Sequence, residues 1–402
     1  MRTTNQLILL FLVFANVSFA QNYQGKIVND KNTGIEFAHV FFLNDQARGS
    51  ISNENGDFNI TVSEANKKDT LVISVLGYKT KFISYAAIDD YNNVIQLSTS
   101  EIKLDEIIVY SDTYFRYILK EAIAKIPDNY LVEEHLQKGY YQNYTISDST
   151  YSEMIEADIQ LISNGYDKAN IKETLYLNQL RKTEDNRNLP ERLKGTNNEI
   201  YNTLRCNSIS KRKLRNFEVS QKLKSINEFV QYVDKFKTLQ FHSQSIQEND
   251  TILTIKILSS FLKMVDLDGH RIHEDAIYTL VSINLSDKAI VKVLHGNIWT
   301  DKKDFQEVSY RKIKGKYYPT YLRTVTSFEF DNKTKSHYSA RNLIFYEVMN
   351  QHEMKGFKKG KKMSIEKDLR NLKMKLDNKF WEKYPHANEL SATLRNLSFK
   401  KK

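Results

Sequence analysis

The sequence predicts a mainly β protein with α-helical additions: an N-terminal seven-stranded antiparallel β-sandwich, then a curved antiparallel sheet or half-barrel. Short strand-like segments separated by turn residues follow one another up to residue 110, which is typical of a small sandwich. Longer segments with a period of two return after residue 131, and their length suits a strongly curved sheet. Only 4 prolines and 13 glycines, against 24 tyrosines, also favour extensive regular structure.

Composition and periodicity divide the chain into five segments. The first 20 residues combine a short apolar run with small residues at positions 18 and 20, which predicts a signal peptide cleaved near Ala20-Gln21. No cysteine follows the run, so no lipobox is expected, and no later stretch is apolar enough for a transmembrane segment. We therefore expect a periplasmic or secreted protein. The segments are 1–20 (signal peptide), 21–110 (sandwich), 111–130 (connecting helix), 131–353 (curved β domain with a helical insertion at about 167–241) and 354–402 (basic helical tail).

A change of period predicts the connecting helix. Tyr114, Ile118, Ala122 and Ile126 recur at intervals of four, with Ser111 or Asp112 as the N-cap. Pro127 and Asn129 are expected to end it. The alternating segments "KGYYQNYTIS" and "TYSEMIEADIQLIS" follow, and we expect them to pair as a hairpin.

The positive charge is concentrated at the C-terminus. The whole chain carries a net charge of +10, and residues 355–402 hold 15 Lys/Arg against 5 Asp/Glu. The rest is near neutral, which argues against a nucleic-acid-binding body. The segment Lys358–Lys362 is a candidate for contact with an anionic surface, and a solvated helix face is the alternative.

The stretch "SISNENGDFNI", Ser50–Ile60, has the composition of a hairpin turn. Asn55-Gly56 favours a positive φ, and the Ser52 and Asn53 side chains can bond turn backbone. Phe58 and Ile60 would then enter the core from one strand face. A calcium loop is the alternative, but the distal bidentate glutamate of an EF-hand is missing.

These residues carry a family resemblance. Residues 25–110 resemble the carboxypeptidase-regulatory-like domain of Bacteroidetes cell-envelope proteins, although Ser52 and Asn53 stand where that family has Thr and Asp. The resemblance implies a transthyretin-like sandwich with a structural or interaction role and no catalytic residues. The C-terminal region is similar to unassigned regions that accompany this module, and its late strands also resemble periplasmic lipoprotein carriers. The matching positions are Gly25, Ala38, Val40, Gly49, Ser50, Ser52, Asn53, Gly56, Phe58, Gly77, Tyr78, Leu104, Glu106 and Ile107.

Candidate chemistry outside this motif is sparse. His270, His273 and Asp275 are weak metal candidates, with a solvated hairpin loop as the alternative. The pair Glu156 and Asp158 could serve acid–base catalysis, or simply face solvent or line a barrel. The zinc-peptidase-like "HANE" at 386–389 has no later histidine to complete a metal site, and Cys206 is the sole cysteine. No catalytic residue, cofactor or metal is therefore predicted.

These observations predict a non-enzymatic binding or scaffold protein of the cell envelope, whose partner is an envelope protein, lipid or glycan rather than nucleic acid. One alternative is a periplasmic carrier of lipid or another apolar ligand, which requires an apolar lining from residues such as Ile252, Ile255, Leu280 and Ile283. A hydrolase would require Glu156 to converge with His270 and His273.

Overall fold

A computed structural model of the chain separates into two compact units. The N-terminal domain comprises Met1–Val75 and Thr80–Ser98, and the curled-sheet domain comprises Leu76–Lys79 and Thr99–Lys402. The predicted signal peptide and most of the predicted helical insertion lie outside the described residues. The structure describes residues 21–100, 111–147, 150–166, 173–182, 199–204, 238–247, 249–258, 277–299, 302–330, 335–364 and 367–384.

The N-terminal domain has the seven predicted strands, arranged in two sheets of order β4-β1-β7 and β3-β2-β5-β6. Most neighbouring strands are antiparallel, but β1 and β7 run parallel, so the purely antiparallel prediction is wrong for this pair. The chain leaves β6 through the 3₁₀ helix η2 (Tyr85–Tyr91) and crosses to the other sheet, which sets the direction of β7. The strands are β1 (Gln21–Val28), β2 (His39–Phe42), β3 (Asp45–Ile51), β4 (Asp57–Val62), β5 (Thr70–Ser74), β6 (Lys81–Ser84) and β7 (Val94–Gln96), and the 3₁₀ helix η1 (Ala65–Lys68) follows β4.

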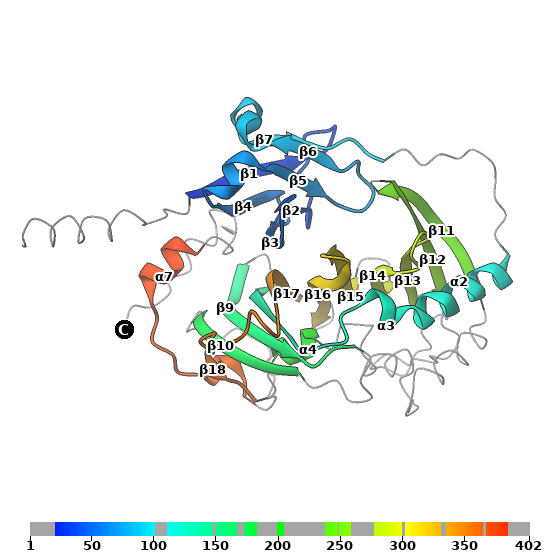
Figure 1. Ribbon diagram of the computed structural model, residues 1–402. Coiled ribbons are helices and arrows are strands. Elements are labelled where there is room, and N and C mark those ends of the chain that lie inside the picture. The colour runs from blue at the N-terminus through cyan, green and yellow to red at the C-terminus, as the bar shows by residue number, and fades with distance from the viewer. Residues whose placement is uncertain are drawn as a thin grey trace, which may run out of the picture. The chain divides into compact units, whose positions relative to one another are not determined.

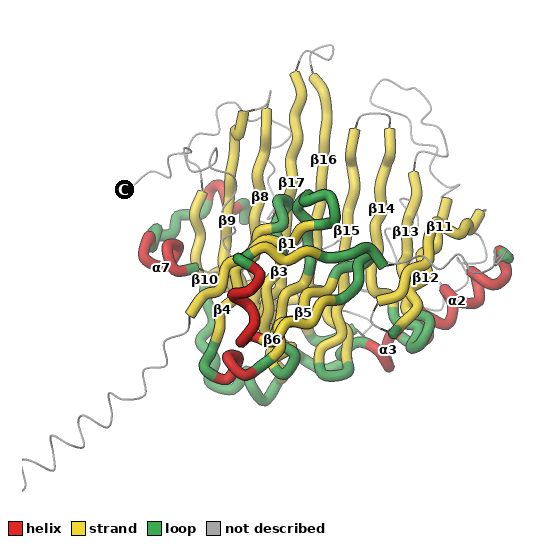
Figure 2. Tube along the Cα trace, turned by 90° about the horizontal axis from the view of Figure 1, so that it is seen from above, coloured by secondary structure: helices red, strands yellow, loops and turns green. Residues whose placement is uncertain are grey.

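The curled-sheet domain is built on one large antiparallel sheet, as predicted. The strand order is β11-β12-β13-β14-β15-β16-β17-β8-β9-β10-β18, and Figure 2 shows the strands side by side from β10 to β11. The expected hairpin is present as β8 and β9. The strands are β8 (His135–Ser147), β9 (Thr150–Ser163), β10 (Glu173–Lys182), β11 (Thr238–Gln247), β12 (Asp250–Leu258), β13 (Ile277–Asn284), β14 (Ile290–Trp299), β15 (Lys302–Ile313), β16 (Lys316–Phe330), β17 (Lys335–Asn350) and β18 (Lys361–Lys362).

The two faces of this sheet differ in chemistry because successive side chains of a strand point to opposite sides. We name them the apolar face and the polar face. On the polar face, one row of paired residues contains Glu307, Arg323, Asn342, Gln142, Glu156 and Arg181. On the apolar face, a row of buried residues crosses nine strands: Ile255, Val281, Val293, Val308, Leu322, Leu343, Tyr141, Ala157 and Leu180.

Helices and the C-terminal segment pack against the apolar face. The predicted connecting helix is α2 (Asp112–Ala124), and the Ser111 hydroxyl caps it by accepting from the Tyr114 amide at 3.2 Å. The short helix α3 (Ile126–Asn129) begins immediately afterwards and contains Pro127. Helix α4 (Glu199–Leu204) joins the same core. The covering side chains include Phe115, Ile118, Leu119, Ala122, Ile123, Ile126, Ile200, Tyr201, Leu204, Met363, Leu369 and Leu372.

Two predictions about segments of the chain are wrong. Strand β10 belongs to the sheet, although residues 167–241 were expected to form a helical insertion. The tail, expected to be helical, is mostly irregular in its described part, whose regular elements are β18, the 3₁₀ helix η5 (Leu369–Asn371) and the short helix α7 (Asn378–Lys383). Its apolar residues pack against the sheet domain, and this tertiary packing outweighs the local helix propensity of the sequence. No helix in the described part of the chain is both long and apolar enough to cross a membrane.

Candidate functional site

The predicted turn in the N-terminal domain is organised by Asn53. Its Oδ1 accepts from the backbone amides of Asn55 and Asp57, both at 2.9 Å. Gly56 has a φ of 83°, and a Cβ there would lie 2.2 Å from the Ile27 carbonyl oxygen. The side-chain oxygen that a calcium loop would require thus bonds the turn itself, and the turn is structural.

Ser52 joins this turn to the neighbouring strand. Its buried hydroxyl accepts from the Ala38 amide at 2.8 Å and donates to the Ile35 carbonyl at 2.7 Å. Phe58 is buried, and its ring centroid lies 5.9 Å from that of Tyr23. The motif residues therefore link backbone segments and fill the core of the domain. Ser52 was expected to bond the turn backbone and instead bonds the segment at Ile35 and Ala38.

The remaining motif positions are close-packed in one case and open in another. Gly49 is paired with Phe41 across β2 and β3. Gly77 has a φ of 92°, with no atom within 4 Å of a would-be Cβ. Tyr78 is half-buried, and its predicted role of covering the end of the sandwich stays a prediction. Positions 104, 106 and 107 lie outside the described residues.

In the curled-sheet domain, strand β9 carries three carboxylates on its two faces. Glu153 lies on the apolar face, while Glu156 and Asp158 lie on the polar face. All three are buried, so of the two alternatives for Glu156 and Asp158, facing solvent or lining the barrel, the solvent-facing one is wrong. A buried carboxylate requires hydrogen-bonding partners to compensate for its lost hydration, and those partners determine what each carboxylate does.

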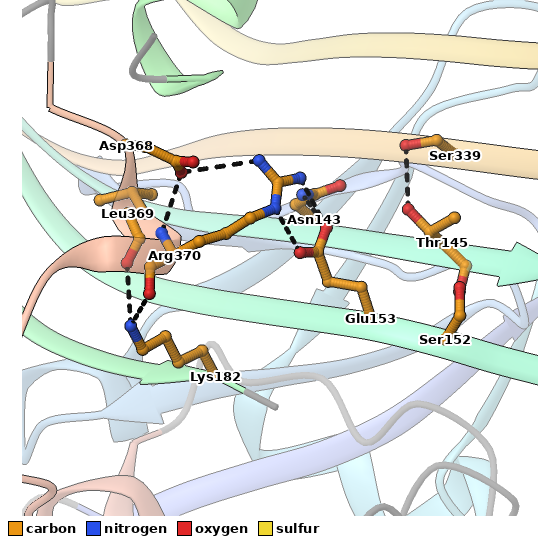
Figure 3. Close-up of polar contacts among 9 residues, drawn as sticks. All are labelled: Asn143, Thr145, Ser152, Glu153, Lys182, Ser339, Asp368, Leu369 and Arg370. Carbon is orange, nitrogen blue, oxygen red and sulfur yellow. Dashed lines mark hydrogen bonds and ion pairs between the residues drawn. The ribbon is translucent and has the colours of Figure 1, made fainter. Parts of the chain in front are cut away.

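Glu153 is paired with Arg370 from the C-terminal segment (Figure 3). The guanidinium donates from Nε to Oε1 at 2.5 Å and from Nη2 to Oε2 at 2.7 Å, a bidentate geometry. Asn143 Nδ2 adds a donor to Oε2 at 3.2 Å. Asp368 Oδ1 also lies 3.5 Å from Arg370 Nη1, so two carboxylates and one guanidinium share this contact.

The side chain of Lys182, at the end of β10, binds backbone carbonyls of the C-terminal segment around Arg370. Its ammonium donates to the carbonyls of Leu369 at 3.3 Å and Leu372 at 3.0 Å, and also to that of Arg370. Figure 3 shows the ammonium beside Leu369 and Arg370, the first two residues of η5. We call the contacts of Glu153, Arg370, Asp368 and Lys182 the ionic latch.

Glu156 is enclosed on the polar face. Arg181 binds both of its carboxylate oxygens, and the Tyr140 hydroxyl donates to Oε1. Burial raises the pKa of Tyr140 well above its ordinary value, and the Glu156 carboxylate adds to this, so the hydroxyl keeps its proton. The Arg181 guanidinium lies 4.5 Å from the ring centroid of Trp381 in α7. Glu156 thus helps to seat α7.

Asp158 accepts three hydrogen bonds. The donors are the Tyr384 hydroxyl at 2.5 Å, the Tyr346 hydroxyl at 2.8 Å and Asn178 Nδ2 at 2.9 Å. Burial raises the pKa of the Asp158 carboxyl, while these donors act in the opposite direction. Tyr384 follows α7, so this carboxylate also anchors the C-terminal segment.

The C-terminal segment therefore wraps the edge of the sheet, and we call residues 358–384 the strap. Gln160, on the polar face, donates to the Lys358 carbonyl at 3.3 Å and accepts from the Gly360 amide at 3.2 Å. Strand β18 then pairs with β10 (Figure 1). Arg370 next reaches the apolar face, and Trp381 returns to the polar face.

The sequence did not identify the strap residues as a cluster. Arg370 is the sole arginine among residues 355–384 and lies two residues after Asp368. Arginine suits buried bidentate pairs better than lysine does. A single arginine in a lysine-rich segment was therefore the sequence feature that could have indicated a buried ion pair at Arg370. Its partner Glu153 is 217 residues away, and nothing local in the sequence connects the two.

The structure does not test the other predicted metal and thiol candidates. His270, His273, Asp275 and Cys206 lie outside the described residues. Lys358, Lys359, Lys361 and Lys362 are exposed. Within the residues that the structure describes, no group of three or more His, Cys, Asp or Glu side chains is placed to hold a metal ion.

Comparison with solved structures gives only weak likenesses, and no curated protein matches the chain. A LolA superfamily protein from Nitrosomonas europaea is 8% identical, with a TM-score of 0.21 over 59% of this chain and 93% of the other. The Pseudomonas aeruginosa MucA/MucB complex structure gives 7% identity and a TM-score of 0.16, over 60% and 98% of the two chains. Scores this low carry no argument on fold or function.

A family model gives a clear match to the N-terminal part. It is the model of the CarboxypepD_reg-like domain, and it matches residues 23–109. The matched range contains Ser52, Asn53, Gly56 and Phe58, whose contacts build the turn described above. The chain carries a CarboxypepD_reg-like domain at residues 23–109.

Proposed function

We propose that the protein is a non-enzymatic binding or scaffold protein of the cell envelope. The observation that carries this proposal is the state of the β9 carboxylates. Glu156 and Asp158 are the acid–base candidates of the sequence, and each is enclosed by donors from its own chain. A general acid or base must reach a substrate proton, and these groups instead hold the strap.

The domain composition supports the same proposal. A CarboxypepD_reg-like domain precedes the curled-sheet domain, and the motif residues of the former are used in turns and core packing. The predicted signal peptide supports an envelope location. We expect the partner to be an envelope protein, lipid or glycan.

The test is to isolate the full chain from its native envelope and to identify the bound material by mass spectrometry. The purified material is then titrated into recombinant protein by calorimetry. Saturable binding with the material chemically unchanged agrees with the proposal. Conversion of that material into a new compound by the protein would contradict it, and Glu156→Gln and Asp158→Asn variants would then show whether the β9 carboxylates take part.

A carrier of an apolar ligand is the alternative, and the long apolar row of the sheet favours it. The four lining residues predicted for a carrier do not share a face, however. Ile255 and Ile283 lie on the apolar face, while Ile252 and Leu280 lie on the polar face. Side chains of α2, α3, α4 and the strap already pack against the apolar row. Saturable uptake of a fluorescent fatty acid by the full chain would favour the carrier role over the scaffold role.

A further inference from the structure

The strap presents a row of exposed lysines. Of the strap carboxylates whose side chains the structure describes, Asp377 is exposed and Asp368 is buried in the ionic latch; the strap sequence also contains Glu366 and Glu382, whose side chains lie outside the described part. Asp377 is also engaged, because its Oδ1 accepts from the Phe380 amide at 3.0 Å at the start of α7. The exposed strap lysines are Lys358, Lys359, Lys361, Lys362, Lys367, Lys373, Lys375 and Lys379.

Local structure explains why these lysines point outward. Between η5 and α7, burial alternates from one residue to the next, and the flanking residues Leu372 and Asp377 have extended backbone conformations. Leu372 is buried and Met374 packs against the core of the sheet domain. Lys373, between these two residues, and Lys375, directly after Met374, are exposed. Because burial alternates, Lys373 and Lys375 lie on the same, solvent-facing side of the segment.

The ionic latch holds the strap in place without using the exposed strap lysines as partners. Arg370 and Lys182 supply the positive charges that bind Glu153, Asp368 and the strap carbonyls. The exposed lysines form no ion pair with any described residue, and Lys359 lies 5.7 Å from the Tyr176 ring centroid. Their charge is therefore not neutralised by the described part of the chain, and a second anionic surface can lower their free energy.

We propose that the strap is an electrostatic docking surface for an anionic lipid bilayer. Lysine is a hydrated point charge suited to lipid headgroups, and each one near an anionic leaflet contributes about 1 kcal/mol. No large hydrophobic side chain in the described strap is exposed, so the docking is peripheral and involves no insertion. An acidic glycan is less favoured, because the strap aromatic Trp381 is buried and Tyr384 stacks on Phe380 instead of offering a sugar-binding platform.

This inference rests on the proposed function and deepens it, because it names anionic lipid as what the strap binds; loss of vesicle binding would overturn the strap proposal alone, since an envelope protein or glycan could still be the partner. The test uses full-length mature protein and sedimentation with phosphatidylcholine vesicles, with and without phosphatidylglycerol. We expect binding only to the anionic vesicles, with a steep loss as salt is raised. The variant Lys361→Gln, Lys373→Gln, Lys375→Gln should weaken this binding about 100-fold.

A matched triple variant controls for net charge. Lys31→Gln, Lys67→Gln and Lys68→Gln remove three exposed lysines of the N-terminal domain and should change vesicle affinity little. All six positions are exposed, so thermal unfolding of both variants should match the parent. Equal weakening by the two triples would overturn the strap as the docking surface. Failure to bind anionic vesicles, with retention on an acidic polysaccharide, would overturn the lipid proposal in favour of a glycan.

Discussion

The two domains are both β structures, but they are held together in different ways. In the N-terminal domain the contacts of the motif residue Ser52 are uncharged and reach only 17 and 14 residues back along the chain, to Ile35 and Ala38. The domain also contains a buried carboxylate, Asp69, which accepts from Asn44. In the curled-sheet domain buried charges join distant segments, as in the pairs Glu153–Arg370 and Asp158–Tyr384. The first kind of contact leaves a local sequence motif, and the second does not.

The largest loss of stability is expected from a substitution that disrupts the backbone packing of the N-terminal domain. In Gly56→Ala the new Cβ would lie 2.2 Å from the Ile27 carbonyl oxygen and 2.9 Å from Gly34 Cα, and φ is positive. We expect a loss of about 5 kcal/mol or more in the free energy of unfolding, measured by calorimetry. Gly77→Ala, in the Leu76–Lys79 segment that groups with the curled-sheet domain, is the control for positive φ without crowding, since φ is again positive but the space is open, and it should cost only about 1–2 kcal/mol in either domain. Equal losses would contradict the role of close packing at Gly56.

The next largest loss of stability is expected from a substitution that breaks the ionic latch. Arg370→Met leaves the fully buried Glu153 carboxylate without its bidentate partner, which should cost about 3–4 kcal/mol. Adding Glu153→Gln should recover much of this loss, because the uncompensated charge is removed. Tryptophan fluorescence during urea unfolding is the measurement, since both tryptophans, Trp299 and Trp381, lie in the curled-sheet domain. A strictly additive double variant would show that the two groups do not interact.

A smaller effect tests the uncharged contacts. Ser52→Ala removes a buried hydroxyl that bonds the Ala38 amide and the Ile35 carbonyl. We expect a loss of about 1–3 kcal/mol in the stability of the N-terminal domain. Ser52→Thr should retain most of the stability, since the hydroxyl is kept. A neutral result for Ser52→Ala would mean that these bonds do not stabilise the domain.

The smallest expected effect concerns pH. His135 is fully buried, with Tyr318 5.6 Å and Tyr166 6.2 Å from its ring centroid. Burial lowers the pKa of His135, so the unfolded chain takes up its proton first as the pH falls. Its contribution to stability is present above the unfolded pKa of about 6.5 and is lost as the pH drops from there towards the folded pKa.

His135→Phe should therefore flatten the fall in urea stability of the curled-sheet domain between neutral and mildly acidic pH. The exposed His352 provides the control, and His352→Phe should leave the slope unchanged. An unchanged slope in His135→Phe would show that another group determines the acid sensitivity.

The sequence could predict whatever depends on local patterns. Alternation predicted the β8–β9 hairpin and the long meander, the interval of four predicted α2, and Asn55-Gly56 predicted the turn. It could not predict that Glu153 and Arg370 meet, because a pair 217 residues apart leaves no periodic signal. The tail was expected to be helical because "IEKDLRNLKMKL" has helix-forming residues, but alternation at Leu372, Met374 and Leu376 also fits an extended segment.

Hydrogen exchange at the strap tests most directly whether it is an integral part of the curled-sheet domain. The Met363 amide bonds the Leu175 carbonyl of β10 at 2.9 Å. This amide should exchange as slowly as those of β9, and Arg370→Met should accelerate its exchange. Exchange of the Met363 amide at the rate of an unstructured peptide, while β9 stays protected, would contradict the account.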